Sequence, residues 1–197
     1  MSRARRSPDL DAAIFTPDAL AENPALARQL LADAGFPGGQ GFPKLELATW
    51  TNTPVLEVLQ QRWKNELGID TAIVLREGRA HLAAMTAGEF DLSLMPLIPD
   101  YNDPSDAFAD LLTGSPANYG RWSEGTYDLL VQDAGRQPDP DRRLALYQAA
   151  EKILLQEMPV IPLYFGMQNY LLSPRVHGWR EDALWTRFYK DIHLNEK

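Results

Sequence analysis

The chain has 197 residues, 45% of them hydrophobic and 23% charged, which suits one domain of ordinary size, or one and a fraction. Its formal net charge of −8 disfavours nucleic acid and anionic membranes as partners, since both are negatively charged. It has no cysteine, which excludes disulfides, thiolate catalysis and cysteine-bound metals, and no run of about eighteen apolar residues that would predict a membrane span.

Residues 1–22 are polar and contain two prolines, and we expect an irregular arm. The first residues are basic, as in a signal peptide, but Asp9, Asp11 and Asp18 interrupt the apolar stretch that would have to follow. We therefore expect no export signal in this chain. A mature fragment, a truncated reading frame and a cytoplasmic protein all stay open.

The pair Asn23-Pro24 predicts the start of a helix that runs to Ala34 and stops at Gly35. Its inward positions are Leu26, Leu30 and Leu31. The next stretch, residues 36–43, is rich in glycine and proline and indicates a loop. It lacks the Lys-Ser/Thr of a phosphate-binding loop and precedes a strand, so a turn is the better interpretation.

Residues 44–94 alternate between strand and helix patterns. We expect strands over 44–50, 69–75 and from Phe90 onward, with helices over 55–67 and 78–87. In the first strand Leu45, Leu47 and Thr49 alternate with Glu46 and Ala48. Strand–helix–strand–helix–strand with short turns predicts an α/β fold, with a parallel βαβ sheet flanked by helices.

The stretch from Phe90 to Pro104 begins as a strand and ends in an acidic turn framed by prolines. Asp103 precedes a proline and predicts a helix N-cap, and Asp106 falls in the first turn of that helix. Asp100 has no such local role. It is either an Asx-turn residue satisfied by nearby amides or a ligand contact. A calcium loop is a weak alternative, because Ser105 stands where glycine is needed.

Helices are expected over 104–112, 123–134 and 140–158, and the last buries Leu146, Ala150, Ile153 and Leu154. Residues 160–165 and 168–173 suggest two antiparallel strands, or one strand interrupted near Gly166. The tail, residues 176–197, has little period. Its aromatic side chains require a partner surface, and they are Trp179, Trp185, Phe188 and Tyr189.

No catalytic or metal-binding arrangement can be identified by spacing. His81, His177 and His193 are far apart in the sequence, which disfavours a zinc site. There is no Gly-x-Ser-x-Gly motif and no paired nucleophile and base, so an enzyme is the third hypothesis. The sequence predicts no cofactor.

Several stretches occur in the order found in one family of receptors. They are Ala-Arg-Gln-Leu-Leu-Ala-Asp-Ala-Gly-Phe-Pro (27–37), Trp-Lys-Asn-Glu-Leu-Gly-Ile (63–69), Gly-Glu-Phe-Asp-Leu (88–92), Asp-Tyr-Asn-Asp-Pro (100–104), Arg-Leu-Ala-Leu-Tyr-Gln-Ala-Ala-Glu-Lys-Ile-Leu (143–154) and Pro-Val-Ile-Pro-Leu-Tyr (159–164). Over residues 22–194 the chain resembles the C-terminal lobe of family 5 solute-binding proteins, the peptide receptors of ABC importers, with dipeptide and nickel-complex relatives.

The resemblance implies a type II periplasmic-binding-protein-like lobe that binds a small peptide or related solute without catalysis. In peptide-binding members the aspartate of the Asp-Tyr motif accepts the ligand's α-ammonium group, and that role falls on Asp100, followed by Tyr101. Two positions depart from the pattern. Leu97 replaces a common tryptophan and Leu94 replaces an arginine, which puts ordinary peptide specificity in doubt. These four residues form the predicted ligand site.

By domains, the resemblance implies an arm at 1–22, the C-terminal lobe at 23–175 and an aromatic tail at 176–197 that returns toward a first lobe absent from this chain. It implies an ABC permease as partner of the parent receptor and a periplasmic or extracytoplasmic location. Half of a cleft should bind peptides weakly. The alternative is a sensor or interaction domain that works with another chain, or as a homodimer through its tail.

Overall fold

A computed structural model describes residues 23–166, 170–180 and 188–194. The described residues belong to two compact units, one formed by residues up to Pro96 and the other beginning at Leu97. The two units have different architectures, one built on a parallel sheet and the other on helices.

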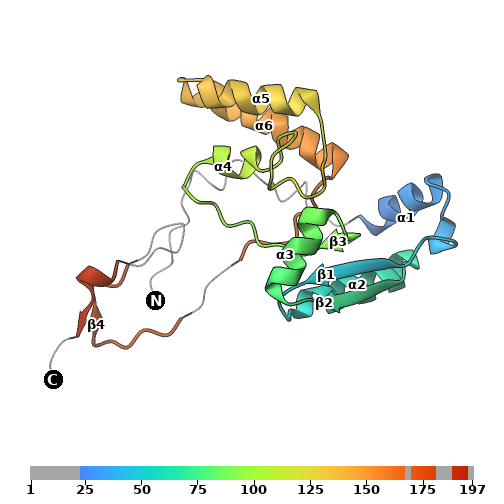
Figure 1. Ribbon diagram of the computed structural model, residues 1–197, viewed down its shortest axis with the longest axis horizontal. Helices are drawn as coiled ribbons and strands as arrows, with labels where there is room; N and C mark the ends of the chain where they lie inside the picture. The colour runs from blue at the N-terminus through green and yellow to red at the C-terminus, as the bar shows by residue number, and fades with distance from the viewer. Residues whose placement is uncertain (1–22, 167–169, 181–187, 195–197) are drawn as a thin grey trace. The chain divides into compact units, whose positions relative to one another are not determined.

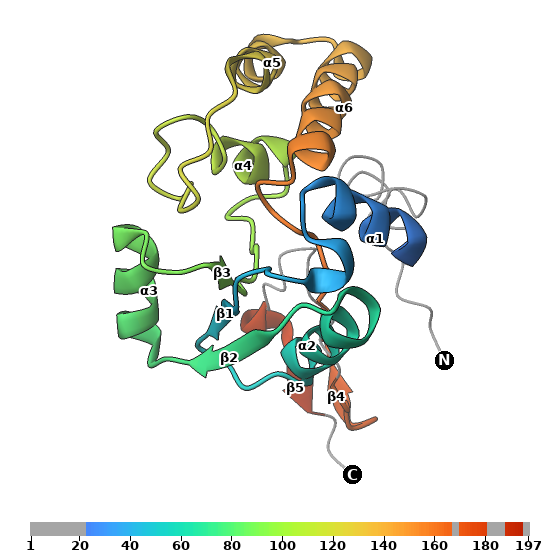
Figure 2. The same ribbon diagram turned by 90° about the vertical axis from the view of Figure 1, so that its right-hand side faces the viewer.

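The first unit is the α/β part of the chain (Figure 1). Its elements are α1 (Pro24–Asp33), the short 3-10 helix η1 (Pro37–Gly39), β1 (Leu45–Thr49), α2 (Pro54–Leu67), β2 (Thr71–Leu75), α3 (Gly78–Ala87) and β3 (Leu92–Ser93). The three strands form one parallel sheet in the order β2-β1-β3. Helices α2 and α3 lie on opposite faces of this sheet (Figures 1 and 2). The predicted α/β fold with a parallel sheet flanked by helices is confirmed.

Local signals fix the ends of these elements. The Thr53 hydroxyl accepts a hydrogen bond from the Val55 amide at the start of α2. Gly68 ends α2 with φ 72°, in the left-handed region that glycine adopts without strain. Gly88 ends α3 in the same way, with φ 78°. These ends agree with the helices predicted over 55–67 and 78–87.

Two expectations for this unit are wrong. The alternation along β1 fails because Leu47, Ala48 and Thr49 are all buried, as happens when helices cover both faces of a parallel sheet. The prediction that Leu26 and Leu30 of α1 point inward is also wrong, because Leu26 is 48% exposed and Leu30 60% exposed. Helix α1 has no fully buried residue, since it lies at the margin of the unit against η1 and α2.

The third strand is shorter than predicted. Only Leu92 and Ser93 pair with β1, opposite Leu47 and Ala48. The Asp91 carboxylate turns back and accepts a hydrogen bond from the Glu46 amide at 2.8 Å. The strand therefore begins after Asp91, and the chain leaves the sheet at Leu94.

The second unit is built around three helices. Its elements are α4 (Pro104–Ala109), α5 (Gly125–Arg136), α6 (Pro140–Glu157), the short strands β4 (Val176–His177) and β5 (His193–Leu194), and the 3-10 helix η2 (Tyr189–Asp191). Helices α5 and α6 lie side by side (Figures 1 and 2). The buried core is aromatic and small-residue in character, and it consists of Phe108, Tyr127, Val131, Ala134, Tyr147 and Ala150.

Two polar side chains in and beside this core, those of Tyr127 and Asn118, form hydrogen bonds within the unit. The Tyr127 hydroxyl donates to the Phe108 carbonyl at 2.7 Å, which joins α5 to the end of α4. Burial raises the pKa of Tyr127 well above its ordinary value. Asn118 donates to the Trp122 carbonyl at 2.7 Å and accepts from the Trp122 amide at 3.1 Å, closing the loop between α4 and α5.

The strands predicted after α6 are not found in the described residues. Residues 160–166 and 170–173 form neither a helix nor a strand, and residues 167–169 lie outside the described part. Val160, Ile161 and Tyr164 are exposed, so this stretch lacks the paired neighbour that a strand requires. In the tail, Trp185 also lies outside the described residues, whereas Trp179, Phe188 and Tyr189 are described.

Candidate functional site

The first part of the predicted site lies at the carboxyl edge of the parallel sheet. The Leu94 amide donates to the Ala48 carbonyl at 2.9 Å, so Leu94 is held at the end of β3 beside the end of β1. The connections from β1 run outward to β2 and then back to β3 on the other side. This reversal is where open α/β sheets bind ligands, just beyond the carboxyl ends of the strands.

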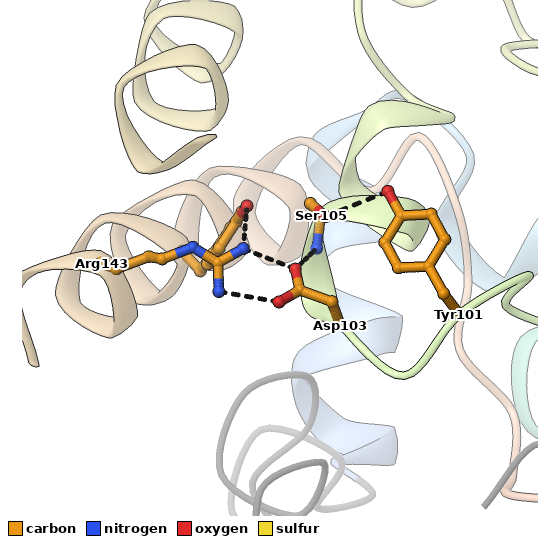
Figure 3. A network of polar contacts seen from close by, with 5 residues as sticks. Tyr101, Asp103, Ser105 and Arg143 are labelled. Atoms are coloured by element: carbon orange, nitrogen blue, oxygen red, sulfur yellow. Dashed lines mark hydrogen bonds and ion pairs between the residues drawn. The ribbon is translucent and has the colours of Figure 1, made fainter. Parts of the chain in front are cut away.

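The acidic turn follows in the second unit, where the Asp103 carboxylate is fully engaged. It caps α4 by accepting a hydrogen bond from the Ser105 amide at 2.9 Å. It also accepts two hydrogen bonds from the Arg143 guanidinium on α6, at 2.9 and 2.5 Å (Figure 3). The bond from Arg143 is the main reason that the pKa of Asp103 falls to about 2. Asp103 is therefore structural, as its N-cap role predicted.

Asp106 is engaged as well, and it positions Asp100. Its Oδ2 accepts a hydrogen bond from the Asp100 amide at 2.6 Å. The Asp100 carboxylate itself is exposed, and it accepts no hydrogen bond and forms no ion pair with any residue that the structure describes. The Asx-turn contact that was the alternative for this side chain is thus not seen there. The backbone of Asp100 is held in place while its carboxylate has no partner among the described residues, which leaves the carboxylate available to a ligand.

Two further predicted residues flank Asp100. Tyr101 is 49% exposed, and its hydroxyl lies 3.1 Å from the Ser105 hydroxyl (Figure 3). Leu97 is 58% exposed and contributes to an apolar cavity of about 60 Å³. The second unit therefore carries Leu97, Asp100 and Tyr101 on one short loop, while Leu94 belongs to the first unit.

The cavity beside Leu97 contains one acidic group. Glu151 of α6 lines it together with Phe108, Leu111 and Leu154. One carboxylate oxygen of Glu151 is buried and has no hydrogen-bond partner. Burial raises the pKa of this carboxyl group to about 7, because its charged form is poorly solvated there.

Arg143 was missed by the sequence reasoning. It lies 40 positions from Asp103, and no local motif links the two. Its guanidinium carbon also lies 5.1 Å from the centre of the Tyr147 ring, a cation–π geometry. The only available signal was that a basic residue stands at the start of the longest helix. The ion pair and the ring together hold the acidic turn against α6.

A second pairing missed from the sequence lies in the first unit. His81 Nε2 is 2.9 Å from the Ser93 hydroxyl, and the Trp50 ring packs edge-on against the imidazole. His81 is fully buried, its Nδ1 has no partner, and burial lowers its pKa. A catalytic dyad needs a group that orients the histidine and an accessible serine. His81 is best understood as a core residue.

The described residues contain no group of three or more His, Cys, Asp or Glu side chains placed to hold a metal ion. Among them, no helix combines the length and apolar character needed to cross a membrane.

The described residues form a parallel α/β sheet and, further along the chain, an acidic turn in which Asp103 and Asp106 are engaged. Comparison with known proteins identifies the class. Residues 6–119 match the model of the bacterial extracellular solute-binding proteins, family 5 Middle. The chain belongs to this family.

Two relatives of the chain are named as solute-binding proteins. The chain is 32% identical over 167 residues to the dipeptide-binding protein DppE of Bacillus subtilis (strain 168), covering 82% of this chain and 30% of that protein. It is 33% identical over 166 residues to the probable deoxycholate-binding periplasmic protein YgiS of Escherichia coli (strain K12), covering 81% and 30%. The chain thus spans about a third of these relatives' length.

Solved structures give the same assignment. The Escherichia coli murein tripeptide binding protein MppA superposes with a TM-score of 0.80 at 25% identity, covering 94% of this chain and 38% of that protein. An oligopeptide-binding protein of Borrelia burgdorferi has a TM-score of 0.81 at 23% identity, which supports the fold alone. The suspected family is therefore confirmed by sequence and by structure.

Proposed function

We propose that this chain supplies part of the ligand-binding cleft of a peptide-type ABC importer receptor, and that it binds small peptides or related solutes without catalysis. In this role Asp100 accepts the ligand's ammonium group. Tyr101, Leu97 and Leu94 contact the remainder of the ligand. Relatives named for dipeptides, murein peptide and deoxycholate support a small solute.

The state of the three acidic residues in the turn carries this proposal. Asp103 is committed to Arg143 and to the helix cap, and Asp106 is committed to the Asp100 amide. Asp100 alone presents a carboxylate without a partner among the described residues. A carboxylate pairs well with an ammonium group, and such charge-assisted bonds are about twice as strong as neutral ones.

The proposal is tested by NMR titration with dipeptides to pentapeptides. Part of a cleft, without closure to exclude water, is expected to bind in the millimolar range. Saturable shifts should centre on the amides of Leu97, Asp100 and Tyr101. N-acetylated peptides, which lack the ammonium group, should not produce them. Shifts that are scattered, or that are equal for both peptide forms, would contradict the proposal.

A charge-matched pair of variants separates the site from general electrostatics. Asp100→Asn should abolish the shifts. Asp133→Asn removes the same charge from an exposed position of α5 and should leave them unchanged. If both variants weaken binding equally, only the net negative charge attracts the peptide.

Partners and location follow from the same proposal. The parent receptor would deliver its solute to an ABC permease outside the cytoplasm, as expected for relatives named as periplasmic. Co-purification of the complete receptor with its permease tests this partner. Its failure with an intact, folded receptor would remove the transport role and leave the binding role standing.

One observation favours a second candidate, an interaction domain that works with another chain or as a dimer. The segment after α6 and the tail expose large apolar side chains, and Phe165 is 65% and Tyr189 69% exposed. Light scattering distinguishes the two candidates. A dimer that Tyr189→Ser dissociates supports the second, and a monomer at high concentration excludes self-association.

A further inference from the structure

Two of the three histidines of the chain face each other in the tail. Strands β4 and β5 are antiparallel, and their register places His177 directly opposite His193. The imidazole rings are stacked, with centres 5.7 Å apart and planes inclined by 25°. Both side chains are exposed, so neither is needed to fill a core. Fifteen residues separate them in sequence, so only the fold brings them together.

The environment of His193 prepares one ring nitrogen for a ligand. Its Nδ1 lies 3.2 Å from the carbonyl oxygen of Asp191, and a carbonyl can only accept a hydrogen bond. In the neutral imidazole this contact places the proton on Nδ1, which leaves the lone pair on Nε2. Metal-binding histidines usually show this arrangement, in which the second nitrogen donates to a carbonyl or carboxylate that fixes the ring.

The described charged side chains near the histidine pair interact with other residues and not with the two rings. The Asp191 carboxylate is engaged in an ion pair with Arg180. Arg180 in turn lies 5.9 Å from the centre of the Phe188 ring. Among the described residues, the imidazole nitrogens remain the available electron-pair donors at this end of the strand pair.

We propose that His177 and His193 form a cross-strand binding site for a divalent transition-metal cation such as Zn²⁺ or Cu²⁺. Imidazole nitrogen is a preferred ligand for both ions. A shared ion at about 2.1 Å from each nitrogen requires the two nitrogens within about 4 Å. The two rings are exposed and opposed, with centres 5.7 Å apart, and would have to rotate to bring one nitrogen of each within this distance. No third protein ligand is assigned, so water completes the coordination and the site is open.

The site would have a mechanical consequence for the tail. Each strand contributes two residues to the pair, and so short a two-stranded pair is marginally stable in water. An ion held by both strands closes the chain between them and favours the paired state by mass action. The metal would act as a clamp on the tail, independently of the solute site.

The test uses the metal-free full chain, titrated with ZnCl₂ and observed by NMR. The chain has three histidines, so His81, buried in the other unit, serves as an internal control. The ring signals of His177 and His193 should shift together and saturate at one equivalent, while those of His81 should not move. Amides of β4 and β5 should exchange more slowly with the metal present.

Substitutions then separate chelation from ring stacking. His177→Phe keeps an aromatic cross-strand pair and removes a ligand, so it should weaken Zn²⁺ binding about tenfold or more. His193→Phe should do the same, and the double variant should lose little more, because chelation needs both rings.

Three results would overturn the site. They are no saturable shift at millimolar Zn²⁺, single variants that bind as the wild type does, and shifts confined to carboxylate-rich segments. The two phenylalanine variants lie on an exposed strand pair outside the helical core, so loss of folding would not explain their loss of binding.

Discussion

Each unit buries a titratable group, and burial shifts the pKa values of the two groups in opposite directions. The sheet unit buries His81, whose charged form is the protonated one, and the histidine pKa falls. The helical unit buries an oxygen of Glu151, whose charged form is the deprotonated one, and the glutamate pKa rises to about 7. Burial disfavours charge in both. The contributions of these two groups to stability should therefore depend on pH with opposite signs, which gives a way to observe each unit separately.

The largest expected effect tests whether each unit has its own core. Tyr127→Ala removes a fully buried ring and the hydroxyl bonded to Phe108, and should destabilise the helical unit by about 3–5 kcal/mol. Leu129→Ala, at a position 63% exposed on the same helix, is the control and should cost little. Amide exchange should show lost protection in α4–α6 while β1 and β2 keep theirs. Equal loss in both units would mean that they unfold together.

The next effect concerns the acidic turn. Asp103→Ala removes the α4 cap and leaves Arg143 without its partner, at a cost of about 1–2 kcal/mol measured by urea unfolding. Asp103→Asn keeps a capping oxygen and should cost less. The wild-type pKa is depressed to about 2, so this contribution is present above the ordinary aspartate pKa and fades as the pH falls toward about 2. This assignment would be contradicted if the unfolding free energy of Asp103→Asn fell with decreasing pH just as that of the wild type does.

The features that can be predicted from the sequence depend on neighbouring residues, whereas those that cannot depend on residues far apart in the chain. Thr53, Gly68 and Asp103 could be assigned from sequence, because a cap or a left-handed stop depends on neighbouring residues. The contact between Asp103 and Arg143 could not, since it joins residues 40 positions apart through the packing of α4 on α6.

The expectations that failed have the same origin. Leu30 has the spacing of an inward residue, but α1 has too little covering it to bury that face. Residues 160–165 have strand composition but no strand beside them. Composition and period identify a surface that can be buried, and the rest of the chain decides whether it is. At the candidate site, the sequence could place Asp100 past a strand end, while its unpaired state depends on what Asp103 and Asp106 contact.

Glu151 provides the first of the two pH tests. Its pKa is raised above the ordinary value of 4.5 to about 7, so the folded helical unit binds a proton that the unfolded chain releases. Stability should therefore fall as the pH rises from about 4.5 to about 7, and level off above. Glu151→Gln should remove this slope and be more stable than the wild type at pH 8. A wild-type slope of the opposite sign would show that the carboxylate finds a partner.

His81 provides the second test, with the opposite sign. Its folded pKa lies below the ordinary 6.5, so the unfolded chain binds the proton first. The sheet unit should hold its full stability above about pH 6.5 and lose it as the pH falls through the folded pKa. Thermal unfolding followed by the Trp50 signal should show this, since Trp50 packs against His81. His81→Gln should flatten the profile.

The smallest expected effect belongs to Asp100, and its smallness is informative. Asp100→Asn removes a carboxylate that has no partner among the described residues, so the unfolding free energy should change by less than about 0.5 kcal/mol. The Asp100 amide keeps its bond to Asp106 in the variant, because that bond uses the backbone. Asp103→Asn, three residues away, makes the matched comparison by urea unfolding. A large loss of unfolding free energy in Asp100→Asn would mean that this side chain stabilises the fold. A negligible loss, combined with lost binding of peptides that have a free ammonium group, would place it in the ligand site.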